Sequence, residues 1–267
     1  IAEVYNQFNE KEQTWPYYSF YLYEDPSINF SKRPQVQSYT QNSKSALFNG
    51  MINPIIPYNI KGSIWYQGEN NVSRFKEYET LFPAMIKDWR KKWNSDFPFY
   101  FVQIAPFENY NGLSSSLRNV QRKTLKVEKT GMVVTLDIGE IDDIHPSNKH
   151  DVGYRLAGLA LSNDYGKSMV ASGPLYKNFE VSGNTLNVTF DFIGSGLTSY
   201  DKELSAFEIA GADKKYVAAE AYIKNNKVYI YSSKIQNPKY ARYAWKDTSV
   251  ASLFNREGLP ASTFTTE

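Results

Sequence analysis

The sequence predicts an α/β domain built on a parallel sheet, followed by a small all-β domain. Between residues 61 and 161, short apolar segments of strand length alternate with longer segments whose apolar residues recur every three or four positions. This alternation is typical of right-handed crossovers over a parallel sheet. Beyond residue 168 the apolar period changes to two, as in half-buried antiparallel strands.

The composition is that of a globular protein, with 42% hydrophobic and 22% charged side chains in 267 residues. A net charge of +2 predicts neither a nucleic acid nor a membrane as partner. No apolar run approaches the roughly 20 residues that cross a bilayer. Cysteine is absent, which excludes disulfides and a Cys nucleophile, and two histidines cannot form the usual zinc set. We therefore expect no metal and no other cofactor.

Residues 1–42 show no regular core element. An aromatic cluster at 15–23 is followed by Pro26 and Pro34. We expect an irregular arm there, or the remnant of an upstream segment. The chain begins at Ile1, and no signal peptide follows it. We expect that it was processed or cut from a longer polypeptide.

Residues 43–167 are expected to form the α/β domain. A short run of mostly apolar residues predicts a buried strand at 61–66, and Ser73 is the expected N-cap of the helix that follows. Pro54 is expected to end the first helix. The further strands are expected at 97–104 and 132–138, and the helices at 43–53, 75–93, 116–127 and 151–161.

Residues 168–267 are expected to form a small β-sandwich. Apolar residues alternate with polar ones from Leu186 to Phe192, and Asn225-Asn226 between two apolar runs predicts a hairpin. Its tyrosines at 222, 229 and 231 can provide a platform for sugars, which leaves a carbohydrate-binding module without chemistry as an alternative function. A domain that only packs against the α/β part is the plainer alternative.

The first candidate loop follows the strand at 61–66. In open parallel sheets, chemistry lies in the loops beyond the carboxyl ends of the strands. Gly68 suits a tight turn, Gln67 and Asn71 offer amide donors, and Glu69 offers a carboxylate. Amide donors directed at one point stabilise a developing oxyanion. The same residues also suit a plain turn that caps the next helix.

The second candidate loop follows the strand at 132–138 and contains His145. Asp142 precedes this histidine by three residues, so it can accept the Nδ1 proton and leave Nε2 as a general base. A surface histidine beside chance acids is the alternative, and His150 is expected to be a plain polar residue. Glu69 and Asp142 can also be paired as glycosidase carboxylates, although a neighbouring histidine is not part of that scheme.

Several ordered stretches resemble one family, the sialate O-acetylesterases, which are carbohydrate esterases of the SGNH hydrolase superfamily. The matching strings are SALFNGMI at 45–52, KGSIWYQGE at 61–69, GMVV at 131–134, DDIHP at 142–146, RYAW at 242–245 and GLPA at 258–261.

The resemblance implies a three-layer α/β/α, flavodoxin-like fold and removal of O-acetyl groups from sialic acid or a related sugar. It implies that His145 is the general base and Asp142 its orienting acid. It implies that Gln67, Gly68 and Glu69, with Asn71 beside them, line the oxyanion and substrate pocket. By the same resemblance, we expect the protein outside the cytoplasm, in the periplasm or secreted.

The chain departs from the family in one respect. The family's nucleophile is a serine in a Gly-Gln-Ser-Asn-Met-type block. A second block with a Trp-Gly-Gly core supplies a backbone amide to the oxyanion hole. Neither string occurs in this sequence. Ser63 at a strand entry and Ser195 in the β domain do not replace the nucleophile. We expect a C-terminal portion without the nucleophile, nearly inactive alone. Its sheet would have an unpaired edge that is covered by self-association or by the 1–42 arm.

Overall fold

The computed structural model describes residue 40 and residues 43–267, which belong to two compact units, Ile1–Ile55 and Ile56–Glu267. The predicted N-terminal arm, residues 1–42, lies almost entirely outside the described residues. In the first unit the predicted helix at 43–53 is present, but most of it is a π-helix, η2 (Phe48–Ile52), followed by a 3₁₀ turn, η3 (Asn53–Ile55).

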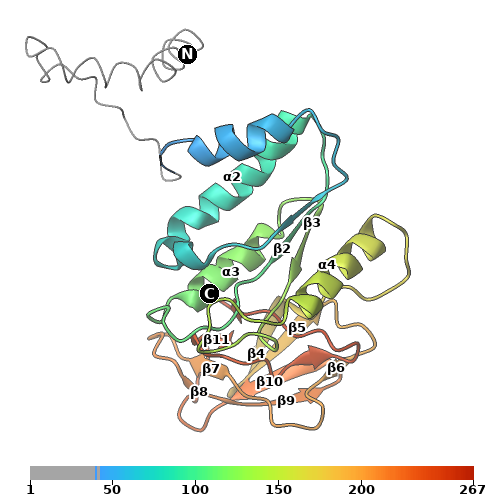
Figure 1. Cartoon of the computed structure of the whole chain (residues 1–267). Coiled ribbons are helices and arrows are strands. Elements are labelled where there is room, and N and C mark those ends of the chain that lie inside the picture. Colours follow the sequence, from blue (N-terminus) through green and yellow to red (C-terminus); the bar gives the residue numbers. More distant parts are fainter. Residues whose placement is uncertain (1–39, 41–42) are drawn as a thin grey trace, which may run out of the picture. The chain divides into compact units, whose positions relative to one another are not determined.

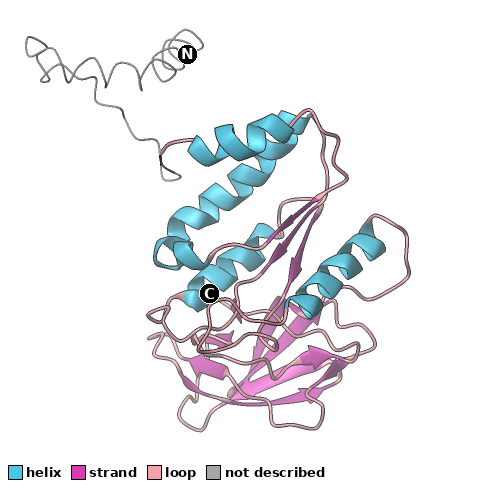
Figure 2. Ribbon diagram, viewed as in Figure 1, coloured by secondary structure: helices cyan, strands magenta, loops and turns pink. Residues whose placement is uncertain are grey.

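The second unit contains a parallel sheet in the order β1-β2-β3, with helices between the strands (Figures 1 and 2). The order of strands and helices confirms the predicted α/β alternation. The elements are β1 (Ser63–Trp65), η4 (Glu69–Arg74), α2 (Phe75–Trp93), β2 (Phe99–Val102), α3 (Ser114–Thr124), β3 (Thr130–Val133) and α4 (Lys149–Asn163).

Helices cover both faces of this sheet, as successive side chains of β2 show. Phe99 and Phe101 pack on the α2 and α3 side, where the Phe82 ring lies 5.1 Å from the Phe101 ring between centroids. Tyr100 and Val102 point to the opposite face and pack against α4. The three-layer α/β/α arrangement is therefore confirmed, in the part of the domain that these three strands form.

Two local predictions are wrong. The first strand is not buried, because β1 is an edge strand among the described residues, and Ile64 is 68% exposed. Ser73 does not cap α2, because it lies inside the 3₁₀ turn η4, which runs directly into the helix. The N-cap position belongs to Arg74, without a side-chain cap. Backbone bonds of a 3₁₀ turn can replace a side-chain cap.

The C-terminal part consists of antiparallel sheets, in the orders β4-β5-β10-β9 and β13-β11-β7-β8, with a further β12-β6 pair. Their inward residues, among them Val188, Ile230 and Tyr243, share one core. The predicted hairpin is confirmed, with positive φ at Asn225 (50°) and Asn226 (56°), as a type I′ turn requires. The strands are β4 (Leu175–Ser182), β5 (Thr185–Asp191), β6 (Leu197–Thr198), β7 (Phe207–Ala210), β8 (Val217–Ala218), β9 (Glu220–Lys224), β10 (Lys227–Tyr231), β11 (Tyr240–Tyr243), β12 (Phe254–Asn255) and β13 (Phe264–Thr265).

The C-terminal strands and the parallel sheet belong to the same compact unit and share an apolar core, and buried polar side chains also connect them. Arg118 of α3 is completely buried and donates hydrogen bonds to Thr263 Oγ1 and to the carbonyls of Ala244 and Lys246. Burial lowers the pKa of Arg118 to about 10, and the nearby Asp247 carboxylate acts against this shift. The position of α3 therefore depends on the C-terminal strands.

Candidate active site

The loops that follow the three parallel strands lie at the carboxyl edge of the sheet. Residues 66–71 follow β1, residues 103–113 follow β2, and residues 134–148 follow β3. The second and third of these loops are joined by a hydrogen bond from the Glu108 N–H to the Ile141 carbonyl, 2.9 Å long. Both candidate loops of the sequence are therefore at the same edge.

A side-chain contact links the first loop to the residues after His145. The ammonium of Lys149, at the start of α4, lies 5.6 Å from the centroid of the Tyr66 ring. Tyr66 directly precedes Gln67, and Lys149 also donates a hydrogen bond to the Pro146 carbonyl, beside His145. This contact places Tyr66 of the first loop beside the start of α4, directly after the His145 loop.

The amide of Gln67 is held in a defined orientation. Its Nε2 donates to Asn71 Oδ1 over 2.8 Å, and the Tyr78 hydroxyl lies 3.3 Å from both its Oε1 and its carbonyl oxygen. Gln121 Nε2 donates to the same carbonyl over 3.4 Å. Since a carboxamide nitrogen carries two hydrogens, one N–H of Gln67 has no partner among the described residues. It is available to a substrate oxygen.

Gly68 occupies a position that no other residue fits without strain. Its φ is 155°, and a Cβ atom there would lie 2.9 Å from Ile104 Cγ2 and 3.1 Å from Gln121 Nε2. Because glycine has no Cβ atom, the backbone at residue 68 can pack closely against Ile104, just after β2, while the chain turns from β1 into η4. Gly68 therefore sets the position of Gln67 before it and of Glu69 after it.

The His145 loop is closed on itself by Glu140. The Oε1 atom of Glu140 accepts hydrogen bonds from the N–H and the hydroxyl of Ser147, at 2.8 and 2.5 Å. These bonds hold the pKa of Glu140 below its usual value. His145 is exposed, and its N–H donates to Asp143 Oδ1 over 2.7 Å. Asp142 is exposed in the same loop.

The predicted contact between Asp142 and the His145 ring is not among the hydrogen bonds of the described residues, so this orienting role stays a prediction. The carboxylate that contacts the backbone of His145 belongs to Asp143. His150 is exposed on α4, with Nδ1 3.2 Å from Asp151 Oδ1.

Tyrosines that sequence reasoning missed surround the Gln67 loop. Burial, with a smaller contribution from the Glu69 carboxylate, raises the pKa of Tyr66 and of Tyr78 to about 12 each. The same two causes raise the pKa of Tyr110, which lies in the loop after β2. These phenols keep their protons at neutral pH and are hydrogen-bond donors. Tyr66 could have been found from its place beside Gln67, whereas nothing local marks Tyr110.

Asp247 of the C-terminal part shapes the loop after β2. Its carboxylate accepts hydrogen bonds from the Gly112 N–H (2.5 Å), the Ser114 N–H (3.0 Å) and the Ser114 hydroxyl (2.6 Å). Its carbonyl accepts one from the Phe107 N–H (3.2 Å). Because Glu108 in this loop binds the His145 loop, Asp247 is connected to the candidate site through two loops.

A hollow of about 420 Å³ lies beside the free edge of β1. Gln67, Asn71 and Tyr78 line it on one side, and apolar residues of α2 such as Leu81 and Met85 on the other. Gln67 therefore lines a hollow on the α2 side of the sheet, whereas Tyr66 contacts Lys149 on the α4 side.

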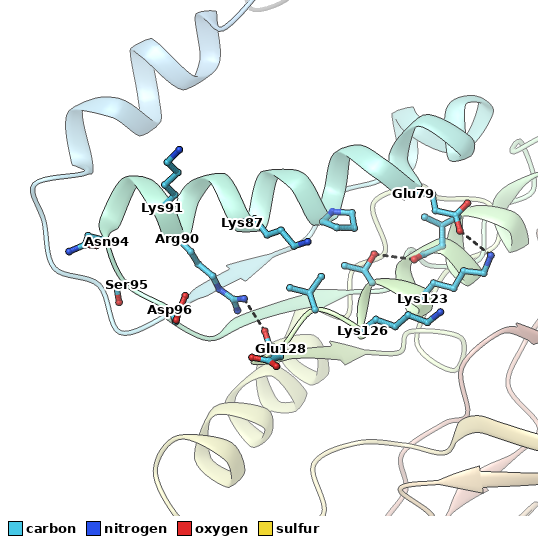
Figure 3. A pocket seen from close by; sticks show the side chains of 14 residues that line it. Glu79, Lys87, Arg90, Lys91, Asn94, Ser95, Asp96, Lys123, Lys126 and Glu128 are labelled. Atoms are coloured by element: carbon cyan, nitrogen blue, oxygen red, sulfur yellow. Dashed lines mark hydrogen bonds and ion pairs between the residues drawn. The ribbon is translucent and has the colours of Figure 1, made fainter.

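A larger hollow, about 930 Å³, lies elsewhere, between α2 and α3 (Figure 3). It includes residues 94–96 and 128, which precede β2 and β3, so it reaches the amino edge of the sheet. Arg90 there donates to the carbonyls of Phe97 and Glu128, and Lys123 pairs with Glu79 over 3.0 Å. Cations in the last turns of helices complement the helix dipole, so this hollow needs no ligand to explain its charge.

Within residue 40 and residues 43–267, no three His, Cys, Asp or Glu side chains are grouped so that they could hold a metal ion. In the same part of the chain, no helix is both long and apolar enough to span a bilayer.

Comparisons with known proteins agree on one family. Residues 33–162 match the model of the family described as "Carbohydrate esterase, sialic acid-specific acetylesterase". The sialate O-acetylesterase of Mus musculus is 32% identical over 193 residues, which cover 63% of this chain, and that of Rattus norvegicus is 34% identical over 172 residues, which cover 55%. A crystal structure of a carbohydrate acetylesterase from Xanthomonas citri is similar with a TM-score of 0.79 and 39% identity over 83% of this chain.

The chain spans about a third of the length of these relatives, 36% of the mouse protein and 32% of the rat protein. It covers 54% of the solved Xanthomonas citri chain. The match to the solved structure reaches beyond the parallel sheet into the C-terminal strands, because it covers more of the chain than residues 33–162 do.

Proposed function

We propose that this chain, whose residues 33–162 match the family of sialic acid-specific acetylesterases, is a carbohydrate esterase of that family. On that premise it takes part in hydrolysing O-acetyl esters of sialic acid or a related sugar. One observation carries the proposal: the Gln67 loop and the His145 loop follow β1 and β3, the strands on either side of β2, at the same edge of the sheet, with a contact between Tyr66 and Lys149. An amide donor and an imidazole at one edge are parts that acyl transfer requires.

In the proposed mechanism, His145 accepts the proton of a serine hydroxyl as this oxygen attacks the acetyl carbonyl. Asp142 orients the imidazole. The free N–H of Gln67 donates to the oxyanion, and Asn71 and Gly68 hold that amide in place. The sugar alcohol leaves with the proton from His145. Water activated by the same imidazole then releases acetate.

The nucleophilic serine is proposed to lie outside these 267 residues. Two serines close to the site are already engaged in the fold, Ser114 with Asp247 and Ser147 with Glu140. Ser63 begins β1, at the edge of the sheet opposite the candidate loops. Among the described residues one edge of β1 has no partner strand, and Ile64 is 68% and Leu81 of α2 57% exposed. These features support further chain or a second copy of this chain covering this surface.

The test is acetate release from an O-acetylated sialic acid. We expect almost none from the 267-residue chain, and turnover from a polypeptide that also carries the residues encoded before Ile1, including a Gly-x-Ser-x block. In that longer protein, His145→Ala should lower turnover on the order of 10⁶-fold and Asp142→Asn on the order of 10⁴-fold, as in other serine hydrolases. His150→Ala is the matched control and should change little.

Two results would overturn the proposal. Full turnover by the 267-residue chain, abolished by substitution of a serine within it, refutes an external nucleophile. Unchanged turnover after His145→Ala removes this residue from the mechanism. Light scattering tests the proposed self-association, since a monomer argues against it. Cell fractionation tests the proposed site of action outside the cytoplasm.

A further inference from the structure

Three tyrosines lie on the outer face of the β4-β5-β10-β9 sheet. Val228 and Ile230 of β10 point into the core, so Tyr229 and Tyr231 between and beyond them point outward. Tyr222 of β9 is directly opposite Tyr229 in the antiparallel register. We call this surface, formed by Tyr222, Tyr229, Tyr231 and their outward neighbours, the tyrosine face.

The rings of the tyrosine face are arranged in a regular way. Tyr222 and Tyr229 stack with centroids 5.0 Å apart and an angle of 7° between the ring planes. Tyr231 meets Tyr222 edge-on at 6.2 Å, and its hydroxyl donates to Glu220 Oε2 over 2.6 Å. Tyr222 is nevertheless 45% exposed, because β9 is the edge strand of this sheet. The Tyr222 ring of the stacked pair is therefore open to solvent.

Polar groups extend the tyrosine face across the sheet. Asn187 of β5 is opposite Tyr229, and Glu180 of β4 is opposite Asn187, so aromatic, amide and carboxylate groups form one row over four strands. Glu180 is exposed and Asn187 is half-buried, so side chains beside the rings offer hydrogen-bonding groups to a ligand.

We propose that the tyrosine face binds a neutral oligosaccharide. A pyranose ring presents apolar C–H groups on one side and hydroxyls around its rim. The apolar side suits the exposed ring of Tyr222, and the rim suits acceptors and donors such as Asn187, Glu180 and the tyrosine hydroxyls.

The charges beside the rings are balanced. Glu180 and Glu220 belong to the tyrosine face, and so do Lys224 and Lys227, which are opposite each other at the next outward positions of β9 and β10. Carboxylates and ammonium groups both form hydrogen bonds with neutral hydroxyls, and together they give this surface no excess of positive charge that would attract acidic sugars or phosphates. We therefore expect the tyrosine face to take a different ligand from the esterase site, and it can bind the neutral sugars of a glycan whose acidic sugar carries the acetyl ester.

The experiment measures binding of the whole 267-residue chain to soluble neutral hexasaccharides of glucose, mannose and galactose, with polysialic acid as the anionic comparison. We expect at least one neutral hexasaccharide to bind, and Tyr222→Ala to weaken it about tenfold. Tyr222→Phe, which keeps the stacking ring, should retain most of the affinity. Tyr154→Ala on α4 is the matched control, since Tyr154 is 66% exposed and lies outside the tyrosine face.

Three outcomes would overturn the inference: no neutral hexasaccharide binds, binding is unaffected by both Tyr222→Ala and Asn187→Ala, or polysialic acid binds to the tyrosine face more tightly than the neutral probes. The thermal midpoint of each variant separates loss of binding from loss of folding. The binding measurement needs no turnover, so its failure and failure of the proposed esterase function are distinguishable.

Discussion

Replacement of Asp247 by alanine should destabilise the second unit strongly. The carboxylate is 8% exposed and accepts three hydrogen bonds, from Gly112 N–H, Ser114 N–H and the Ser114 hydroxyl. Each bond to a charged acceptor contributes about 1.5–3 kcal/mol, and donors left buried without partners lose the full benefit. Asp247 also supplies a negative charge near the buried Arg118 guanidinium. The loss of carboxylate and charge together should lower the free energy of unfolding by about 3–5 kcal/mol.

Thermal denaturation measures this loss. A loss of this size in a unit of about 200 residues corresponds to a fall in Tm of about 10 °C. Asp247→Asn keeps one acceptor oxygen and should lose about half as much. Glu203→Ala is the control, since Glu203 is an exposed carboxylate of the same part of the chain and should change stability by no more than about 0.5 kcal/mol.

Hydrogen exchange locates the effect. In Asp247→Ala, the amides of Gly112 and Ser114 should lose protection first, followed by Glu108, whose N–H binds Ile141 in the His145 loop. A Tm within about 2 °C of the parent chain, with unchanged exchange at Gly112 and Ser114, would refute the reasoning that the C-terminal part holds this loop in place.

Gly68→Ala should cost about 1–3 kcal/mol in a denaturant titration, because the new Cβ would lie 2.9 Å from a methyl carbon of the loop after β2 at a φ of 155°. Gly153→Ala, where no atom lies within 4 Å in α4, is its control and should be neutral or stabilising. Glu140→Gln should speed hydrogen exchange of the Ser147 amide at neutral pH. The pKa of Glu140 is lowered in the folded chain, so the stabilisation that its carboxylate contributes is present above the pKa of the unfolded chain and is lost as the pH falls through the folded pKa. Acidification of the parent chain should therefore speed exchange of the Ser147 amide in the same way. Unchanged exchange in both experiments contradicts the proposed closure. The raised pKa of Tyr78 stabilises the fold below about pH 10, and this stability is lost as the pH rises towards about 12. The unfolding free energy of Tyr78→Phe should therefore fall less over that range than that of the parent chain, and an equal fall in both would contradict this role.

Local pattern was sufficient to predict the elements of the α/β part and one hairpin of the C-terminal part. The helix α2 was evident from apolar residues at every third or fourth position, and the hairpin around Asn225-Asn226 from its turn residues. A two-residue turn also sets the register, so that Tyr222 and Tyr229 had to be opposite each other. The order of the loops with Gln67 and His145 followed from the strands that precede them.

Other features could not be predicted because no short-range signal marks them. The Ser114 amide and the Asp247 carboxylate are 133 residues apart in the chain, yet this carboxylate caps α3. Ser73 looked like an N-cap because its residue type suits one, but the 3₁₀ turn η4 already continues into α2. Ile64 looked buried because it is apolar, and only its neighbours decide whether an apolar side chain is covered.

By itself, the sequence determined which elements form in the α/β part, in which order, and which side chains follow each of its strands, because periodicity and turn chemistry act over a few residues. Tertiary structure alone decided which loops meet at the sheet edge, which strand has an open side, and which phenols are held neutral. Those properties depend on burial and on partners far along the chain, and no local window of residues contains them.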